Sequence, residues 1–250
     1  MDLKTFFEEN PRAAIAFSGG TDSAYLLFAA KHFGAEVCAY YAKTAFQPQF
    51  ELEDARRLAE QLSVPLRVVE LDILACDAVA ANPADRCYHC KRALFSAICA
   101  AAHADGYSLV LDGTNASDDA ADRPGMRALR ELSVRSPLRA CGLTKAEVRS
   151  RSREAGLFTW DKPAYACLAT RIPCGEGITA EKLARTEEAE SFLFSLGLRD
   201  VRVRLRGGRA KLEVGAADVP LLEEHKTEIF GRLRALYGDA EAKWEVRDAK

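Results

Sequence analysis

The chain has 250 residues, of which 48% are hydrophobic and 29% are charged, and its formal net charge is −2. These values are ordinary for a globular protein with a sizeable core, and a net charge so close to zero argues against general attraction to nucleic acid or membranes. No stretch reaches the roughly 20 apolar residues of a membrane span. The first residues, MDLKTFFEENPR, lack the apolar region of a secretory signal, so we expect a cytoplasmic protein.

The first half of the chain alternates short apolar runs with helical patterns. We expect strands over residues 13–17, 36–41, 66–71 and 107–111, and helices over residues 22–33, 50–62 and 91–104. This alternation predicts an α/β fold, with a parallel sheet covered by helices on both faces. A sheet of this kind binds its ligands beyond the carboxyl ends of the strands.

The second half begins with a polar run over residues 118–125, which predicts an irregular loop. A helix over residues 144–155 is indicated by the capping-box pattern of Thr144 and Glu147. Prolines and glycines then accumulate over residues 160–177, and we expect a hinge there.

The last part of the chain has a pattern too short for a second large sheet. A helix, two strands, a helix and a strand are expected over residues 179–196, 200–205, 210–214, 221–236 and 243–246. This order predicts a small α+β domain. We therefore expect a first domain over residues 1–160, a hinge over 161–177 and a second domain over 178–250.

An abrupt turn, Ser18-Gly-Gly-Thr-Asp-Ser23, joins the first strand to the first helix. Gly19 and Gly20 permit backbone conformations that side chains forbid, so the amides of residues 19–23 can point outward at a helix N-terminus and favour an anion. Three hydroxyl groups are available as further donors, on Ser18, Thr21 and Ser23. The alternative is a plain strand–helix turn with Ser23 as its cap.

This turn resembles the PP-loop of ATP pyrophosphatases, which share the pattern SGGxDS. In that family the loop holds the pyrophosphate released when ATP adenylates a carboxylate or carbonyl group. The resemblance implies an adenine nucleotide alpha hydrolase-like parallel sheet domain that uses ATP with Mg²⁺. Asp22 would orient this catalytic system or cap the helix.

Two further places near strand ends are candidates for contacts with the nucleotide. Lys43 follows the second strand and is either a phosphate ligand or a solvated lysine. The run over residues 112–118 follows the fourth strand, where we expect contacts from Gly113, Thr114, Asn115 and Asp118. An Asx-rich turn without a ligand explains this run equally well.

The chain has eight cysteines, which in a reducing compartment are poor candidates for disulfides. Cys87 and Cys90 lie three positions apart, and this spacing points to metal or redox chemistry. The spacing alone supports two interpretations equally. One is structural zinc on Cys87, Cys90 and Cys167, with His89 or Cys174 as fourth ligand, and the other is an iron–sulfur cluster.

Several motifs together are similar to the LarE-type sulfur transferases, which serve biosynthesis of the nickel-pincer nucleotide cofactor of lactate racemase. They are Asn82–Lys91, Asp112–Asp118, Arg123–Gly125, Arg135–Leu138 and Trp160–Arg171. The resemblance covers essentially the whole chain. It implies an enzyme that adenylates the carboxylates of pyridinium-3,5-biscarboxylic acid mononucleotide and converts them to thiocarboxylates, with sulfide or another compound as sulfur donor.

The family has two versions, and the cysteines distinguish them. One version sacrifices the sulfur of a single hinge cysteine, and the other carries a [4Fe-4S] cluster on three cysteines. The Cys-x-x-Cys pair implies the cluster version, with Cys87, Cys90 and Cys167 as ligands and Cys167 also catalytic. Cys174 departs from the family, which usually has an aromatic residue there. It is a fourth ligand, a persulfide relay or a spectator, and we favour the spectator.

The second domain supplies the expected substrate contacts. Arg202, Arg204 and Arg206 alternate along one strand and so share a face, which is either solvated or binds a phosphate-bearing substrate. The resemblance implies Arg202 as a substrate ligand, with Glu190 and Glu213 near a metal or the substrate. It also implies a homo-oligomer, for which a hexamer is one candidate.

Three other functions compete with this interpretation. A tRNA thiolase combines a PP-loop with a three-cysteine cluster, but the near-neutral charge argues against a nucleic-acid partner. An amide-forming PP-loop synthetase would use Cys87 and Cys90 for structural zinc. A nucleotide-sensing module with a structural metal would not be an enzyme.

Overall fold

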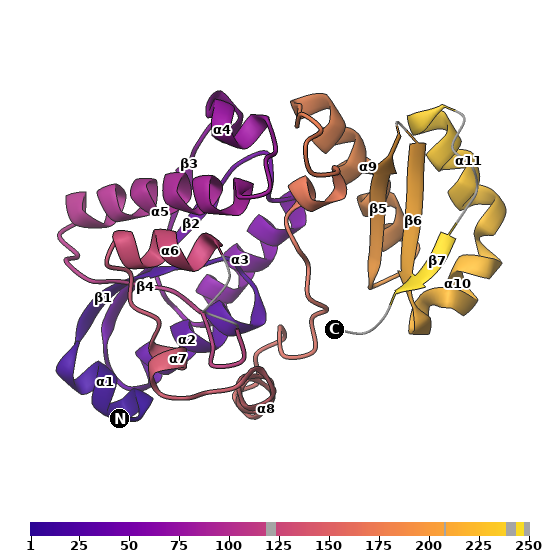
Figure 1. Cartoon of the computed structure of the whole chain (residues 1–250). Coiled ribbons are helices and arrows are strands. Elements are labelled where there is room, and N and C mark those ends of the chain that lie inside the picture. Colours follow the sequence, from indigo (N-terminus) through magenta and orange to yellow (C-terminus); the bar gives the residue numbers. More distant parts are fainter. Residues whose placement is uncertain (119–123, 208, 239–243, 248–250) are drawn as a thin grey trace. The chain divides into compact units, whose positions relative to one another are not determined.

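The computed structural model of the chain describes residues 1–118, 124–207, 209–238 and 244–247. The chain forms two compact units (Figure 1). The PP-loop unit comprises Met1–Ile73 and Asp85–Ala164, and the C-terminal unit comprises Leu74–Ala84 and Tyr165–Lys250. The segment over residues 74–84 thus groups with the C-terminal unit, and the predicted boundaries at residues 160 and 177 stay a prediction.

The PP-loop unit is built on a four-stranded parallel sheet with the order β3-β2-β1-β4. Its strands are β1 (Arg12–Ala16), β2 (Glu36–Lys43), β3 (Leu66–Glu70) and β4 (Val110–Leu111). In the register, Ala14 lies between Cys38 of β2 and Val110 of β4. The predicted α/β fold with a parallel sheet is confirmed.

Successive residues of the central strands pack on opposite faces of this sheet, as the two-residue period of a strand requires. Ala13 and Ile15 of β1 enter one core with helices α1, α2, α3 and α8, whereas Ala14 and Ala16 enter another with α5 and α6. Figure 1 shows these two groups of helices on the two sides of the sheet. Burial on both faces explains why the strands are apolar throughout.

The helices of the PP-loop unit mostly follow the predicted ranges. They are α1 (Leu3–Glu9), α2 (Thr21–His32), α3 (Gln49–Gln61), α5 (Arg86–Ala104), α6 (Pro124–Glu131), α7 (Pro137–Ala140) and α8 (Lys145–Glu154). The capping box of α8 is confirmed, because Thr144 Oγ1 accepts from the Glu147 N–H while the Glu147 carboxylate accepts from the Thr144 N–H. Helices α1, α6 and α7 were not predicted.

Two predicted elements of this unit have different bounds. Helix α5 begins at Arg86 rather than residue 91, because Tyr88 is buried against α6 and its hydroxyl donates to Glu131 Oε2 at 2.8 Å. Strand β4 begins at Val110 rather than residue 107, because the N–H of Tyr107 bonds back to the carbonyl of α5 at Ala102. Residues 124 and 125 of the predicted loop belong to α6, and residues 119–123 lie outside the described residues.

The C-terminal unit is a small α+β fold, as predicted. Its sheet has the order β5-β6-β7, with β5 antiparallel and β7 parallel to β6. Its elements are α4 (Asp77–Ala80), α9 (Ala180–Ser195), β5 (Val201–Arg206), β6 (Arg209–Gly215), α10 (Val219–Glu224), α11 (Lys226–Tyr237) and β7 (Trp244–Arg247), with the short 3-10 turns η2 (Leu168–Arg171) and η3 (Ala216–Asp218). A third turn, η1 (Ile73–Ala75), spans the boundary between the two units. The single helix predicted over 221–236 is wrong, because the backbone turns at His225 between α10 and α11.

Asn82 attaches the segment 74–84 to the rest of the C-terminal unit. Its side-chain amide donates to the carbonyl oxygens of Pro173 at 2.7 Å and Glu176 at 3.1 Å. Its own carbonyl accepts from the N–H of Gly175 at 2.8 Å. The loop that carries Cys174 is therefore fixed by a segment far away in the sequence.

Among the helices that the structure describes, none combines the length and the apolar character needed to cross a membrane.

Candidate active site

The predicted nucleotide-binding turns lie at the point where the order of strands reverses. The chain proceeds from β1 outward to β2 and β3, and β4 then pairs with the other side of β1. The turn at residues 18–23 follows β1, and the loop at 112–118 follows β4. In open parallel sheets, ligands bind outside the carboxyl ends of the two strands that flank such a reversal.

The turn brings the backbone close to the neighbouring helix α3. Gly19 has φ +72°, and a Cβ atom there would lie 3.1 Å from the Glu51 carbonyl oxygen and 3.3 Å from Ala55 Cβ. Helix α2 begins at Thr21, directly after the turn. Because the first N–H groups of a helix have no partner within the helix, they are available to an anion.

The hydroxyl groups of the turn do not all face outward. The Thr21 hydroxyl donates to the Thr159 carbonyl at 2.7 Å, so it holds the segment before the hinge. The Ser23 hydroxyl closes the turn, since it donates to the Gly20 carbonyl at 3.2 Å and accepts from the Ser18 N–H at 3.3 Å. Ser18 is exposed. The N-cap of α2 is Gly20 and Ser23 lies inside the helix, so the alternative with Ser23 as the cap is wrong. Ser23 closes the turn instead.

Asp22 lies in the first turn of α2 and is mostly buried. Burial raises the pKa of its carboxyl group, and a hydrogen bond from the Asn115 side chain and the positive charge of Lys145 oppose that rise. Its Oδ1 atom is buried without a hydrogen-bond partner among the described residues. A buried carboxylate oxygen with open lone pairs is the kind of ligand that Mg²⁺ takes. The residues present fit a magnesium nucleotide here.

The loop after β4 packs against the first turn of α2. A Cβ atom on Gly113 would lie 2.7 Å from the backbone nitrogen of Ser23 and 2.9 Å from its Cα atom, so only glycine allows this approach. Asn115 is buried, and its side-chain oxygen accepts from the Ser117 N–H at 2.8 Å, which is the hydrogen bond of an Asx turn. The Asx turn exists, and it lies against the predicted anion site.

The other predicted residues of this loop maintain its shape. Asp118 Oδ2 accepts from the Asn115 N–H at 3.2 Å. The Thr114 hydroxyl donates to Asp112, which is buried and also accepts from the Ser136 hydroxyl. Lys43 stands apart at the end of β2, half-buried, with Nζ donating to the Gln47 carbonyl at 2.5 Å. This contact within the protein differs from the solvated alternative, and the role of Lys43 as a phosphate ligand stays a prediction.

Sequence reasoning missed two cations beside Asp22. Lys145 and Arg149 both lower the pKa of the Asp22 carboxyl group. They lie four residues apart on α8, and so on one face of that helix. Arg149 also donates to the carbonyl oxygens of Trp160 at 2.7 Å and Lys162 at 2.8 Å. The four-residue spacing of Lys145 and Arg149 was the signal in the sequence that could have indicated a shared helix face.

The predicted metal ligands are divided between the two units. Cys87 is exposed and Cys90 partly exposed, one turn apart at the start of α5 in the PP-loop unit. Cys167 is partly exposed and precedes η2 in the C-terminal unit. His89, a candidate zinc ligand, contacts Asp85 at 3.3 Å. Within the described part of the chain, no three His, Cys, Asp or Glu side chains come together to hold a metal ion.

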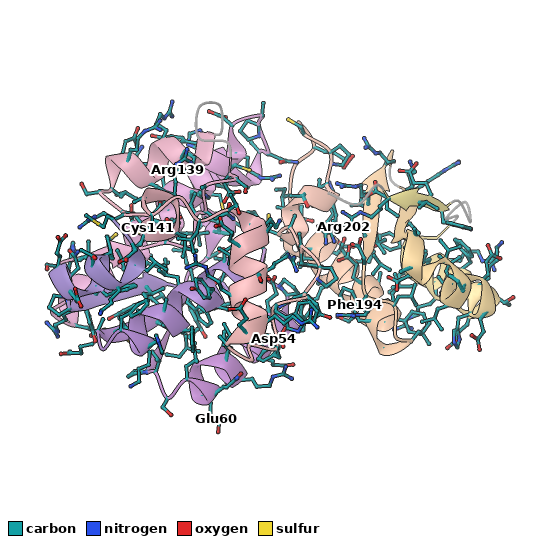
Figure 2. All side chains as sticks on the ribbon, turned by 90° about the horizontal axis from the view of Figure 1, so that it is seen from below. Asp54, Glu60, Arg139, Cys141, Phe194 and Arg202 are labelled. Carbon is teal, nitrogen blue, oxygen red and sulfur yellow. The ribbon has the colours of Figure 1, made fainter. Side chains whose placement is uncertain are left out.

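The predicted substrate residues lie in the C-terminal unit, where Figure 2 labels Arg202. Arg202 is 4% exposed, and its guanidinium lies 5.3 Å from the centre of the Tyr165 ring. Burial, together with the charges of Arg171 and Arg247, lowers the pKa of Arg202 to about 10, so it stays protonated at neutral pH. Of the two interpretations of this face, the burial of Arg202 argues against the solvated one at that position, whereas Arg206 is exposed.

Glu190 and Glu213 are both engaged by arginines. Glu190 is 1% exposed and accepts from Arg171 at 2.7 and 2.9 Å. Glu213 accepts from Arg204 at 2.6 Å. A cavity of about 210 Å³ lies beside these pairs and is lined by Thr170, Arg171, Ile172, Pro173, Cys174, Arg204, Leu205 and Arg206. Cys174 lines this cavity and is exposed.

Comparison with known proteins finds one matching family model and several similar proteins. Residues 12–83 match the sequence model of the family described as queuosine biosynthesis protein QueC. A pyridinium-3,5-bisthiocarboxylic acid mononucleotide synthase of Lactiplantibacillus plantarum is 34% identical over 210 residues, which cover 83% of this chain and 76% of the relative.

Two uncharacterised proteins are also similar. One, from Synechocystis sp., is 41% identical over 214 residues, or 85% of this chain and 80% of the relative. The other, from Methanocaldococcus jannaschii, is 29% identical over 233 residues, or 93% of this chain and 88% of the relative.

Proposed function

Because the chain belongs to the LarE-type family of ATP-dependent PP-loop sulfur transferases, we propose that it makes pyridinium-3,5-bisthiocarboxylic acid mononucleotide. Its substrate is the corresponding biscarboxylic acid, and the product serves nickel-pincer cofactor biosynthesis. The observation that carries the proposal is the first turn of α2. Its first N–H groups have no partner within the helix, and Asp22 Oδ1 is buried without a hydrogen-bond partner among the described residues.

The first half-reaction is adenylation. A substrate carboxylate oxygen attacks the α-phosphorus of ATP, an acyl adenylate forms, and pyrophosphate leaves. The leaving group gains charge, and the N–H groups of residues 19–23 with the hydroxyls of the turn would stabilise it. Asp22 would hold Mg²⁺, which neutralises phosphate charge when bound. Lys145 and Arg149 would hold the Asp22 carboxylate in its charged form.

The loop after β4 is assigned a second set of contacts at the nucleotide site. Gly113, Thr114, Asn115 and Asp118 are proposed to contact the nucleotide or the activated acid. The close packing of Gly113 on Ser23 supports this assignment, since it leaves the loop and the turn side by side. Lys43 is proposed to reach a phosphate after releasing the Gln47 carbonyl.

The second half-reaction replaces AMP with sulfur. Hydrosulfide attacks the acyl carbon, the bond to the AMP oxygen breaks, and a thiocarboxylate, AMP and a proton result, with no net oxidation. We assign Cys87, Cys90 and Cys167 as ligands of a [4Fe-4S] cluster, with Cys167 also acting in sulfur transfer. Three thiolate donors support this assignment, and they would leave one iron of the cluster without a protein ligand.

Substrate contacts are assigned to the C-terminal unit. The buried guanidinium of Arg202 is proposed as a ligand of the substrate phosphate, since a fork of N–H donors matches phosphate oxygens. Glu190 and Glu213 are the carboxylates expected near it. We also propose that the protein acts in the cytoplasm as a homo-oligomer, for which a hexamer is one candidate, and that no nucleic acid takes part.

The proposal is tested with ATP, Mg²⁺, sulfide and the biscarboxylic mononucleotide, in protein reconstituted anaerobically with iron and sulfide. We expect substrate-dependent release of AMP and pyrophosphate, and a product whose mass shows oxygen replaced by sulfur. A colourless, zinc-loaded protein would overturn the cluster. Loss of sulfur from Cys167, detected by mass spectrometry, would favour the sacrificial route. An amide formed with ammonia, or thiolation of tRNA, would overturn the substrate assignment.

A further inference from the structure

Arg171 is buried to an unusual degree for an arginine. It is 1% exposed and ranks first by volume among the fully buried side chains of the described residues. Burying a guanidinium is costly unless its charge is paired and its N–H groups are bonded. Nε and Nη2 donate to the two carboxylate oxygens of Glu190 at 2.7 and 2.9 Å, as a bidentate ion pair.

The carboxylate of Glu190 has no acceptor site left. Its Oε1 atom also accepts from the Val203 N–H at 2.8 Å, and its Oε2 atom accepts from the Tyr165 hydroxyl at 2.5 Å. With the two bonds from Arg171, four donors occupy the approximately four lone-pair sites of a carboxylate. A metal ion or substrate could bind Glu190 only by displacing one of these donors.

The third nitrogen of Arg171 points to the backbone around Cys167. Nη1 donates to the Ala166 carbonyl at 2.9 Å and to Thr170 Oγ1 at 2.8 Å, and lies 3.5 Å from the Cys167 carbonyl. The Thr170 hydroxyl and N–H both donate to the Cys167 carbonyl, at 2.8 and 3.0 Å. The guanidinium of Arg171 therefore holds the peptide groups on both sides of Cys167, directly and through Thr170.

A second ion pair supports the same segment. Arg204 donates to Glu213 at 2.6 Å through Nε and to the Thr170 carbonyl at 2.7 Å through Nη1. Arg204 and Glu213 lie on the paired strands β5 and β6. The segment that follows Cys167 is therefore tied to the sheet of the C-terminal unit.

We propose that Arg171 and Glu190 are positioning residues for Cys167. Arg171 holds the backbone on both sides of the cysteine, so the thiol leaves the chain in one orientation, and Glu190 acts through Arg171 without contacting substrate or metal. The inference rests on the proposed role of Cys167 in sulfur transfer. It changes the assignment of Glu190, whose carboxylate is used within the protein.

The test separates adenylation from thiolation in the complete protein. Arg171→Lys keeps the positive charge but not the planar fork, and Glu190→Gln keeps the size but not the charge. For both we expect thiocarboxylate formation to fall about 10–100-fold, and to fall more than substrate-dependent pyrophosphate release does. Because both changes break one network, the double variant should be no slower than the slower single variant.

A second measurement reports on the thiol directly. Trypsin separates Cys167 from Cys174 after residue 171, and Arg171→Lys keeps this cleavage site. Peptide-resolved alkylation with iodoacetamide, compared at one pH, should therefore show a changed rate at Cys167 and an unchanged rate at Cys174. Tyr165→Phe, which removes one donor to Glu190, gives a milder change if the other variants fold poorly. Arg185→Lys, in an exposed pair on α9, is the matched control and should change no readout.

Three results would overturn the proposal. One is an unchanged ratio of thiolation to adenylation in both variants, and another is a Cys167 alkylation rate like that of the wild type. The third is a large rise in the substrate KM for adenylation in Glu190→Gln alone, as expected of a substrate or metal ligand. Failure of the proposed function would appear separately, as absence of thiocarboxylate from the wild-type protein.

Discussion

In the PP-loop unit, the Asp22 carboxylate has a buried oxygen without a hydrogen-bond partner among the described residues, whereas in the C-terminal unit both oxygens of Glu190 accept two hydrogen bonds each. Glu190 is buried as a whole, and Asp22 has at least its Oδ1 atom buried. Only Glu190 has a cation bound in a bidentate pair, while Lys145 and Arg149 affect Asp22 only through their charge.

This difference in hydrogen bonding indicates a ligand site at Asp22 and a structural role for Glu190. Buried polar groups in native proteins are nearly always bonded, so an exception calls for a ligand that completes it. Asp22 is such an exception, and the open N–H groups of α2 lie beside it. The Glu190 network is complete without a ligand. We therefore expect substitutions at Asp22 to change chemistry, and substitutions at Glu190 to change the structure around Cys167.

The largest effect is expected for Glu190→Ala. It leaves the buried guanidinium of Arg171 without its counter-ion, and breaking a buried pair in this way costs about 3–5 kcal/mol. Urea unfolding should be followed in a Trp160→Phe background, where Trp244 of β7 is the remaining tryptophan and reports on the C-terminal unit.

Glu223→Ala is the control for this measurement. Glu223 pairs with Lys226 at 3.0 Å, with both side chains nearly half exposed. Such surface pairs contribute about 0–1 kcal/mol. Equal losses from Glu190→Ala and Glu223→Ala would show that the Glu190 network is not the scaffold proposed here.

Asp22→Ala should have the second largest effect. It should lower the rate of adenylation without lowering stability. Removing a group that stabilises charge in the transition state costs about 100-fold or more in rate. Pyrophosphate release should therefore fall by that factor, while the urea midpoint of the PP-loop unit should not decrease. A rate close to that of the wild type would remove Asp22 from the mechanism.

Gly113→Ala tests the packing of the two nucleotide-binding segments. The added Cβ atom would meet the backbone of Ser23, which cannot move without shifting the start of α2. Overpacking of this kind costs about 1–3 kcal/mol, and adenylation should weaken with it. Gly231→Ala is the matched control, because it lies inside α11 with no atom within 4 Å of the added Cβ. It should stabilise by about 0.5–1 kcal/mol. Similar behaviour of the two variants would contradict the close approach.

The fold was largely predictable because its signals are local. Apolar runs bounded by polar turns located β1, β2 and β3 within a few residues, and the capping box located the start of α8. The start of α5 was not predictable, because it depends on the contact of Tyr88 with Glu131. Nor was the place of segment 74–84, which Asn82 attaches to carbonyl groups about 90 positions away.

The candidate site also has features with a local sequence signal and features that depend on tertiary packing. The turn at residues 18–23 and the loop at 112–118 carry local glycine and Asx signals, and the sequence placed both at strand ends. The cations beside Asp22 come from α8, and their role depends on how that helix packs against α2. The bonds that occupy Glu190 come from three separate segments, at Tyr165, Arg171 and Val203. No spacing rule connects them.

The smallest effect is the pH dependence of stability at Asp22, measured with Asp22→Asn and without ligands. Burial raises the pKa of this carboxyl group in the folded state, so the folded chain binds more protons than the unfolded chain between the ordinary and the raised pKa. Stability of the wild type therefore falls as the pH rises through that window. The Asn variant lacks this loss and should be the more stable protein above the raised pKa, with the difference shrinking as the pH falls.

Mg²⁺ and ATP should reverse the order, since a ligand that binds only the folded chain stabilises it by mass action, and the wild type binds both. The readout is unfolding followed through Trp160 in a Trp244→Phe background. If the Asn variant is less stable at neutral pH without ligands, the hydrogen bond from Asn115 and the charges of Lys145 and Arg149 outweigh the burial of the Asp22 carboxylate. The contrast with Glu190 would then fail, because both carboxylates would belong to the scaffold.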